Sequence, residues 1–347
     1  MSDNVVREEE TTLSVLRTTR PTMRDVAVLA GVSLKTVSRV INDEPGVAAA
    51  TAEKVEHAIA ELRFQRNDLA RSLRQGRTSS TLGLVIEDVS NPFYSAIAQA
   101  VESAARERGY MLITASCEED PERERDLVMA LLRRRVDALL LVPAARDHAY
   151  LARDQIPVVF LDRPPHGLDA DCVLLDNLGG ARTAVEHLLA RGHQRIAVIA
   201  DPDRLYTARE RLSGYRQALE AAGVPIRDEL IRLGSHDSAT AEAVVTELLA
   251  LPPDRRPTAV FAGNNRNTVG ALRALQQAER PLALVGFDDF ELADLLGTTV
   301  VRHDSGSMGA HAAALAFERL TSADHAPRRV VVPTELIVRG SGEVPPS

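Results

Sequence analysis

The sequence is poor in cysteine, lacks a long apolar run and does not begin like a secretory signal, and each absence excludes a class of protein. Two cysteines, Cys117 and Cys172, cannot build a disulfide framework and do not stand at a metal-ligand spacing, so we expect reduced thiols in a cytoplasmic protein. No run of about 18 apolar residues occurs, and we expect no membrane-spanning segment. The N-terminus carries Glu8–Glu10 and no apolar segment, so we expect residues 1–21 to form a disordered leader.

The motifs of common enzymes and cofactor sites are missing as well. The chain contains no Gly-x-Gly-x-x-Gly, no phosphate loop and no nucleophile elbow. The histidines His187, His193 and His303 are scattered without ligand-like pairing, and Gly192-His193 fits a helix end that runs into a strand. We therefore expect no enzyme, no catalytic residue, no cofactor and no metal site.

What the chain does have is enough length for two cores and an uneven distribution of charge. It has 347 residues and a hydrophobic fraction of 45%, typical of a globular protein with more than one domain. The net charge of −8 taken alone argues against a nucleic-acid partner. However, residues 17–77 contain 11 Lys and Arg against 7 Asp and Glu, whereas residues 78–347 contain 29 against 38. A basic head on an acidic body is expected when only one end contacts phosphate, although a surplus of this size is also common in ordinary proteins.

Residues 22–42 predict two short helices joined by a tight turn. Gly31 can adopt the left-handed conformation that ends the first helix, Val32 would fill the angle between the helices, and Ser33 can cap the second helix. This is a helix-turn-helix, whose second helix lies in the major groove of DNA. The apolar residues fall on two helical faces, which are Val26, Leu29 and Ala30, and Val37, Val40 and Ile41.

The second helix of this motif carries the expected DNA contacts. Leu34 and Lys35 open the helix and point outward, with Arg39 one turn further on, so they should read base edges. Short polar side chains that fix register on phosphates come next to them. Together with Thr22, these are Ser33, Thr36, Ser38 and Asn42.

A third helix is predicted over Thr51–Leu62 and would close a three-helix head. Its inward-facing residues are Ala52, Val55, Ala58, Ile59 and Leu62. The alternative is a plain helical hairpin within an α-helical bundle. The small, hydroxyl-rich and basic residues on the exposed face of the second helix favour the DNA-binding interpretation.

A short helical segment and a linker follow the head. Asn67 is a good N-cap for a helix over Asn67–Arg74, which is too short to be stable alone, and Gly76, Ser79 and Ser80 mark a linker. A helix that folds only against DNA and a partner copy would act as a switch.

Residues 22–79 resemble the headpiece and hinge of the LacI/GalR (lactose-repressor) family, and the resemblance continues to Gly340. It rests on a specific pattern, which is Asp25-Val26-Ala27, Ala30-Gly31-Val32-Ser33, Thr36-Val37-Ser38-Arg39-Val40 and Asn42. The resemblance implies that Asn67–Arg74 is the hinge helix, in which Leu73 inserts into the minor groove with Ala70 beside it. One departure is Ala48-Ala49, where the family usually has a serine cap and a proline. A missing cap destabilises a helix by roughly 1 kcal/mol, which leaves the assignment standing.

From Thr81 onward, apolar runs alternate with amphipathic stretches and predict repeated βαβ units. Such repeats form open sheets covered by helices, and the length of this region suggests two of them. The expected strands are Leu82–Ile86, Met111–Ala115, Ala138–Val142, Val158–Leu161, Arg195–Ile199, Ala259–Phe261 and Leu282–Val285. The expected helices are Phe93–Arg108, Pro121–Arg135, Gly179–Arg191, Arg209–Ala222 and Ala239–Leu251.

The whole chain is therefore predicted to be an α/β protein with an all-helical head. We expect a helix-turn-helix domain over residues 22–66, a hinge helix and linker over residues 67–80, and two Rossmann-like lobes of the periplasmic-binding-protein type over residues 81–347. The lobes would bind an effector and form the dimer.

Ligands of open α/β sheets bind at the carboxyl ends of the strands, so polar residues at those positions are site candidates. Carboxylates and amides there pair with sugar hydroxyls, and an aromatic ring can cover an apolar sugar face. This places Asn91, Phe93 and Tyr94 in an effector site. The resemblance adds Arg211 and carries effector contacts onto Asp162, Asn264 and Asp288.

The segment Asn264-Asn265-Arg266 departs from the family, which commonly has Asn-Asp and a smaller neighbour there. Losing that carboxylate puts the usual sugar contact at Asn265 in doubt. For any one of these residues, a strand-end cap or a hydrogen bond between the lobes is the alternative role.

We expect a homodimer, with a tetramer left open, that represses transcription from a roughly palindromic operator under control of a sugar. It would act in the cytoplasm, on the nucleoid. Effector would change the angle between the lobes and hence the spacing of the hinge segments, as inducer or as corepressor. Two alternatives stay open. One is a sugar-binding receptor or enzyme whose head merely dimerises, and the other is a regulator of the same kind whose ligand is a nucleobase or a phosphorylated cofactor.

Overall fold

The computed structural model describes residues 21–42, 44–64, 79–154, 156–278, 281–322 and 325–346. The chain divides into two compact units, residues 1–77 and 78–347. The expected leader and the expected hinge helix lie outside the described residues, and so do the predicted DNA contacts Asn67, Ala70 and Leu73.

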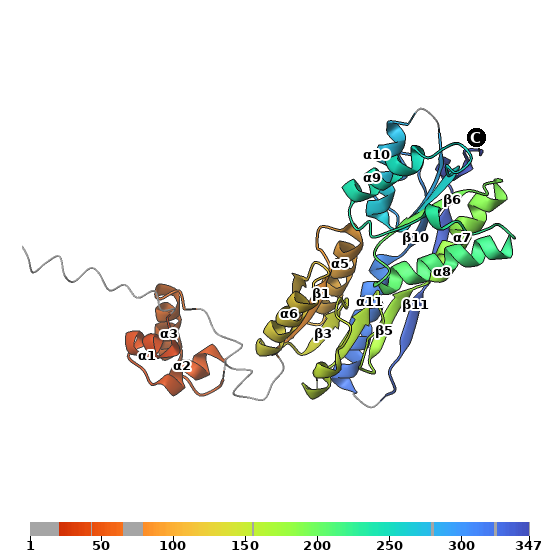
Figure 1. The fold of residues 1–347 in the computed structure, drawn as a ribbon. Coiled ribbons are helices and arrows are strands. Elements are labelled where there is room, and N and C mark those ends of the chain that lie inside the picture. The colour runs from red at the N-terminus through yellow and green to blue at the C-terminus, as the bar shows by residue number, and fades with distance from the viewer. Residues whose placement is uncertain are drawn as a thin grey trace, which may run out of the picture. The chain divides into compact units, whose positions relative to one another are not determined.

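Within residues 21–42 and 44–64, the described part of the first unit, lie the helices α1 (Met23–Ala30), α2 (Leu34–Ile41) and α3 (Ala49–Glu61) (Figure 1). Gly31 ends α1 in the left-handed conformation, with φ of 65°. The Ser33 hydroxyl caps α2 by accepting from the backbone N–H of Thr36. The predicted helix-turn-helix geometry is therefore confirmed.

The core of this head joins all three helices. Val26, Val37 and Val55 are fully buried, one from each helix. The apolar face predicted for the first helix, Val26 with Leu29 and Ala30, is not the buried face, because Leu29 is 45% exposed and Ala27 is buried instead. Because α1 packs against both α2 and α3, its buried face contains the adjacent residues Val26 and Ala27. As expected, Ala48 provides no side-chain cap for α3.

The second unit consists of two lobes, each built on a six-stranded sheet with helices on both faces. In the N-terminal lobe the strand order is β11-β5-β4-β3-β1-β2, and all neighbours are parallel. Helices α5 and α11 pack together on one face, and α6 covers the other. The elements are β1 (Thr81–Ile86), α5 (Pro92–Glu107), β2 (Met111–Ser116), α6 (Pro121–Arg133), β3 (Ala138–Leu141), η1 (Ala149–Arg153), β4 (Val158–Leu161), β5 (Asp171–Leu175), α11 (Ser305–Thr321) and β11 (Arg329–Val332).

The C-terminal lobe repeats this plan with the order β12-β10-β9-β8-β6-β7, in which only the edge strand β12 is antiparallel to its neighbour. Helices α7 and α8 cover one face, and α9 and α10 cover the other. The elements are α7 (Asn177–Ala190), β6 (Ile196–Ala200), α8 (Tyr206–Ala221), η2 (Asp228–Leu230), β7 (Ile231–Leu233), α9 (Ser238–Leu249), β8 (Ala259–Ala262), α10 (Asn265–Gln276), β9 (Ala283–Phe287), β10 (Thr299–His303), β12 (Thr334–Ile337) and η3 (Ser341–Glu343).

The chain passes between the lobes three times, after β5, after β10 and between β11 and β12. Three crossings link two bodies that each have their own sheet, which is the connectivity of a hinged two-lobed protein. The predicted pair of Rossmann-like lobes is thereby confirmed. In the described part of the chain, none of the helices combines the length and apolar character needed to cross a membrane.

Candidate functional site

A cavity of about 480 Å³ lies between the two lobes. Its walls come from the segments that follow strands of both sheets, which is where open α/β sheets bind ligands. All of the predicted effector residues line it, which are Asn91, Phe93, Tyr94, Asp162, Arg211, Asn264 and Asp288.

The wall from the N-terminal lobe combines an aromatic pair with a buried carboxylate. Asn91 caps α5 by accepting from the backbone N–H of Phe93 at 3.1 Å. The rings of Phe93 and Tyr94 meet edge to face with centroids 4.8 Å apart. The Tyr94 hydroxyl donates to Oδ2 of Asp162 at 3.3 Å. Burial raises the pKa of the Asp162 carboxyl above its ordinary value, although Arg163, whose Nε lies 3.5 Å from Oδ2 of Asp162, acts in the opposite direction.

The wall from the C-terminal lobe is organised around Arg211, which lies on α8 and is buried. Its Nε donates to Oδ1 of Asn177 at 2.8 Å, and one terminal nitrogen donates to the carbonyl of Gly263. The guanidinium also stacks over the Phe287 ring at 3.7 Å and lies 3.7 Å from Oδ1 of Asp288. These contacts fix the orientation of the arginine before any ligand arrives.

Asp288 is a fixed anion beside that arginine. His303 Nε2 lies 2.8 Å from its Oδ1, and the backbone N–H of Asn265 donates to Oδ2 at 3.4 Å. Burial acts to raise its pKa, but the positive charge of Arg211 and the hydrogen bond with His303 hold the pKa below its ordinary value.

Asn264 caps α10 through Oδ1, which accepts from the backbone N–H of Asn267 at 2.7 Å. Its Nδ2 donates to Oδ2 of Asp201 at 2.7 Å. Both ends of the amide therefore have a partner, and the alternative role of a strand-end cap applies to this residue in addition to its place in the cavity wall.

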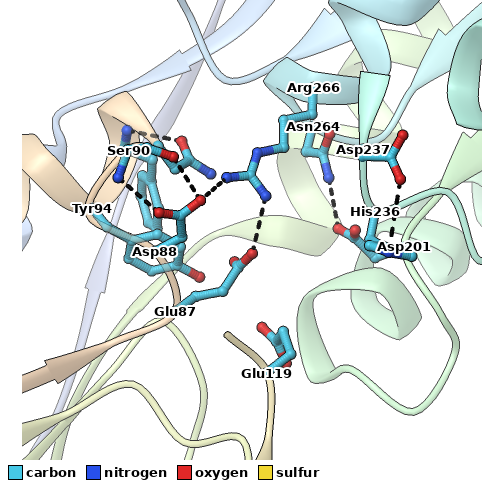
Figure 2. Close-up of polar contacts among 12 residues, drawn as sticks. Glu87, Asp88, Ser90, Tyr94, Glu119, Asp201, His236, Asp237, Asn264 and Arg266 are labelled. Carbon is cyan, nitrogen blue, oxygen red and sulfur yellow. Dashed lines mark hydrogen bonds and ion pairs between the residues drawn. The ribbon is translucent and has the colours of Figure 1, made fainter. Parts of the chain in front are cut away.

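The position of Asn265 clarifies the departure from the family pattern. Asn265 is buried and absent from the cavity lining, and its Nδ2 donates to Oδ1 of Asn91 at 2.9 Å. The next residue, Arg266, lines the cavity in its place and reaches Glu87 and Asp88 in the other lobe (Figure 2).

Charged residues give the cavity its acidic character, and several of them were not among the predicted effector residues. The carboxylates that line it are Glu87, Asp88, Glu118, Glu119, Asp120, Asp162, Asp201 and Asp288, and the arginines are Arg163, Arg204, Arg211 and Arg266. Glu87, Asp88 and Arg163 carried a usable signal, because they directly follow strands. Glu119 and Asp201 also follow strands, but the strand ends were placed too early to expose them as candidates.

Glu87 shows the consequence of this excess of carboxylates. Burial and the nearby carboxylate of Glu119 raise its pKa to about 7, and Asp201 acts in the same direction. The positive charges of Arg163 and Arg266 act in the opposite direction but do not restore the ordinary value. The cavity is thus an acidic environment in which a further negative charge would be disfavoured.

The head presents its predicted DNA-contact residues on α2 and at its ends. Leu34 is 52% exposed, Lys35 is exposed and Arg39 is half-buried. The hydroxyls of Ser33 and Thr36 lie 2.8 Å apart and share a hydrogen bond. The first residues of a recognition helix are the ones that contact base edges, so the exposure of Leu34 and Lys35 is compatible with the predicted contacts, which stay predictions.

Three other predicted contact residues of the head have local hydrogen-bond roles. Thr22 caps α1, and its hydroxyl donates to Oδ2 of Asp25 at 2.6 Å. Asn42 Nδ2 donates to the Ser38 hydroxyl at 3.4 Å and to Oε1 of Glu44 at 3.2 Å. These bonds position the ends of both helices, and the DNA contacts of these residues stay predictions.

Comparison with known families assigns both units. The family described as bacterial regulatory proteins, lacI family, matches residues 22–67. The family described as periplasmic binding proteins and sugar binding domain of LacI family matches residues 79–290. The second match alone spans more than half of the chain.

Individual relatives match along almost the whole length. The ribose operon repressor of Escherichia coli (strain K12) is 37% identical over 330 residues, which cover 92% of this chain and 99% of the relative. The structure of a complex of the transcriptional regulator CelR with cellobiose shares 34% identity and a TM-score of 0.68, covering 93% of this chain and 100% of that one.

A third similar structure is that of a lac repressor dimer bound to operator and the anti-inducer ONPF. It has a TM-score of 0.77 at 27% identity and covers 93% of this chain and 99% of that one. The helix-turn-helix, the two lobes with their shared cavity and these matches agree. The chain belongs to the LacI family of bacterial regulatory proteins, which regulate transcription by binding DNA.

Proposed function

We propose that this chain is a homodimeric repressor that reads a roughly palindromic operator through α2 and responds to an uncharged sugar bound between the lobes. One observation carries the proposal, which is that both lobes supply walls of a single cavity. An occupant contacts both lobes, so its affinity depends on the angle between them, and by linkage it can shift the equilibrium between two arrangements. The role of the cavity is binding rather than catalysis.

The hydrogen-bonding groups of the cavity support a sugar as the ligand. Carboxylate oxygens accept from hydroxyl groups, and the aromatic pair of Phe93 and Tyr94 offers an apolar surface to a sugar ring. Two similar proteins are named for uncharged sugars, the ribose operon repressor and the CelR–cellobiose complex.

The pairing of the arginines favours an uncharged ligand over a phosphorylated one. Each of the four lining arginines already forms an ion pair with a carboxylate of the chain. Arg163, for example, donates to both carboxylate oxygens of Glu119 and to the carbonyl of Pro143 at 3.0 Å. A phosphate group would have to displace a carboxylate and would leave it unpaired in the cavity.

The exposed apolar surface of the C-terminal lobe supports the dimer. The loop between β9 and β10 presents Leu292, Leu295 and Leu296 to solvent, and Leu295 is 81% exposed. Clusters of exposed large apolar side chains mark protein interfaces, and a two-fold dimer matches the symmetry of a palindromic operator. An operator is a segment of chromosomal DNA, so we place the functional dimer on chromosomal DNA in the cytoplasm.

The DNA-binding half is tested with a head variant in which Lys35 and Arg39 are both replaced by alanine. Each good base contact contributes ~1–3 kcal/mol, so affinity for operator DNA should fall on the order of a hundredfold. The DNA is a fragment selected from a random library by the full-length protein, and binding is measured by fluorescence anisotropy across a salt series.

Lys54→Ala is the matched control, because Lys54 is an exposed basic residue of the same head on α3. It should leave sequence preference intact. Unchanged affinity and an unchanged steep salt dependence in the double variant would contradict the proposal that α2 reads the operator.

The effector half is tested by isothermal titration of the full-length protein with a panel of pentoses, hexoses and disaccharides and their phosphorylated counterparts. We expect heat from an unphosphorylated sugar and none from its phosphate. Silence across the unphosphorylated panel would contradict a sugar effector. A phosphate that binds more tightly than its parent sugar would contradict the charge argument.

A further inference from the structure

Two ionic contacts in the cleft join side chains from both lobes, a longer one between Arg204 and Glu119 at 3.8 Å and a closer one made by Arg266. Arg266, near the start of α10 in the C-terminal lobe, extends toward two carboxylates that follow β1 in the N-terminal lobe (Figure 2). Its NH1 lies 3.3 Å from Oε1 of Glu87, and its NH2 forms an ion pair with Asp88. The neighbouring residue adds the hydrogen bond from Asn265 to Asn91 across the same gap.

We propose that Arg266, Glu87 and Asp88 form a clasp that holds the two lobes of the effector cleft together and makes Arg266 the residue that sets how readily the cleft opens. The clasp consists of the chain's own side chains, so it can form in the absence of an effector. The inference rests on the proposed function only in taking this cavity as the effector site.

The environment of the clasp makes its contacts stronger than ordinary surface ion pairs. About a quarter or less of the side-chain surface of Arg266 and Glu87 is exposed, 26% and 19% respectively. Partly buried pairs are screened by salt much less than exposed ones. One guanidinium that serves two carboxylates also has a geometry that a single lysine charge does not reproduce.

The charge distribution around the clasp makes Arg266 necessary rather than incidental. Glu119 in the same lobe and Asp201 in the opposite lobe both act unfavourably on the Glu87 carboxylate, and Arg163 and Arg266 act favourably. Of those two arginines, only Arg266 comes from the opposite lobe. Without its charge, the Glu87 and Asp88 carboxylates would lose the cation that reaches them from the opposite lobe, and the unfavourable effect of Asp201 on Glu87 would be less well balanced.

A partner on its own lobe keeps Asp88 in position for the clasp. Its two carboxylate oxygens accept from the backbone N–H of Ser90 at 2.8 Å and from the Ser90 hydroxyl at 2.7 Å. The pKa of the Asp88 carboxyl lies below its ordinary value because of these hydrogen bonds, with a smaller contribution from Arg266. Asp88 is thus a pre-positioned anion for an arginine that arrives from the other lobe.

The test measures the opening of the cleft directly in the full-length protein. Spin labels on Gln99→Cys in α5 and Gln276→Cys in α10 report the distance between the two helices by double electron–electron resonance. Both positions are exposed, and the native cysteines are buried, so labelling is confined to the introduced sites.

We expect one narrow distance distribution with native Arg266 and at least a twofold larger fraction of long distances in Arg266→Leu. Leucine removes the charge but keeps an aliphatic stem. Arg266→Lys keeps one ion pair and should lie between the two. The control is Arg273→Leu on the exposed face of α10, which should match the protein with native Arg266 and Arg273.

An unchanged distribution in Arg266→Leu, equal to that of the Arg273→Leu control, would overturn the clasp. The measurement needs neither DNA nor effector, so its failure is distinct from failure of the proposed function, which is read from DNA affinity and sugar binding. If the clasp holds, apparent affinity for a sugar that binds the closed lobes should also fall in Arg266→Leu. Because Arg266 lines the cavity, the spin-label distances rather than this affinity test the clasp.

Discussion

Each lobe has an aspartate directly after a strand of its parallel sheet, yet the pKa values of the two carboxyls are shifted in opposite directions. Asp162 follows β4 and Asp288 follows β9, and both adopt the left-handed backbone region, with φ of 65° and 68°. Both are buried in the cavity wall. Burial raises the pKa of Asp162, whereas Arg211 and His303 outweigh burial and lower the pKa of Asp288.

This difference shows that the fold sets the position of a site residue and the neighbours set its chemistry. A non-glycine residue in the left-handed region is strained, and such strain is concentrated at functional sites. The C-terminal lobe offers a fixed anion that accepts hydrogen bonds. The N-terminal lobe offers a carboxyl that can also donate when protonated. A sugar hydroxyl acts as donor and acceptor, so the two walls together suit it better than either wall alone.

The largest expected effect comes from removing Arg211, the cation that forms an ion pair with Asp288. Arg211→Ala leaves Asp288 buried without its ion-pair partner and removes the stacking on Phe287, so the free energy of unfolding should fall by about 3 kcal/mol. Urea denaturation at pH 7 measures it. Arg216→Ala on the exposed side of the same helix is the control, with an expected change below ~0.5 kcal/mol. Equal losses in both variants would show that Arg211 has no special role.

The second effect concerns Glu87, whose raised pKa makes the N-terminal wall sensitive to pH. The folded state holds this proton more tightly than the unfolded state, so stability should fall as pH rises from about 4.5 through about 7. Glu87→Gln removes this loss. At pH 8 the variant should be more stable than the native protein by up to about 3 kcal/mol, and at pH 5 the gap should be small. A gap that does not change with pH would contradict the assignment.

The third prediction compares how the stabilities of Asp288→Asn and Asp162→Asn depend on pH. Asp288→Asn removes an anion that the fold stabilises and should cost about 2 kcal/mol at pH 7. The loss should shrink as pH falls through the low pKa of Asp288. Asp162→Asn imitates the protonated form, so the variant should gain relative stability as pH rises above 3.8. Thermal unfolding of both variants across pH measures this, and pH dependences of the same sign would break the comparison.

The smallest effect tests the hydroxyl that contacts Asp162. Tyr94→Phe removes the donor to Oδ2 of Asp162 and should lower stability by about 1 kcal/mol. Tyr110→Phe in the same lobe is the control, since its ring packs against Phe317. Chemical denaturation of both variants measures the difference. A larger loss from Tyr110→Phe would indicate that the Tyr94–Asp162 contact adds little.

The head could be predicted almost completely because its information is contiguous. Gly31 and Ser33 specify a helix stop and a helix start within three residues, and the structure has both. The exception is Leu29, since a short helix with several apolar residues does not reveal which of them meets the other helices. That choice depends on packing against α2 and α3.

The cleft could be predicted residue by residue for a different reason. Each of the seven predicted effector residues lines the cavity. Six of them follow strands, whose carboxyl ends are brought together by the fold itself, whereas Arg211 on α8 came from the family resemblance alone. The strands β5, β7, β10, β11 and β12 were not predicted. For β11 the neighbouring strand is remote in sequence, as in the pairing of Cys172 with Arg329, so the local pattern does not reveal that it joins this sheet.

The sequence alone predicted the family plan, the helix-turn-helix and seven residues that line the cavity between the lobes, through local signals, a general rule for parallel sheets and the family resemblance. Only the tertiary structure decided the opposite directions in which the pKa values of Asp162 and Asp288 shift, the acidic surroundings of Glu87 and the contact of Arg266 with the opposite lobe. Those properties depend on distances between side chains that lie up to 179 positions apart in the chain. Charge interactions fall with distance in space, and burial removes the water that would screen them, so only the folded arrangement sets their strength.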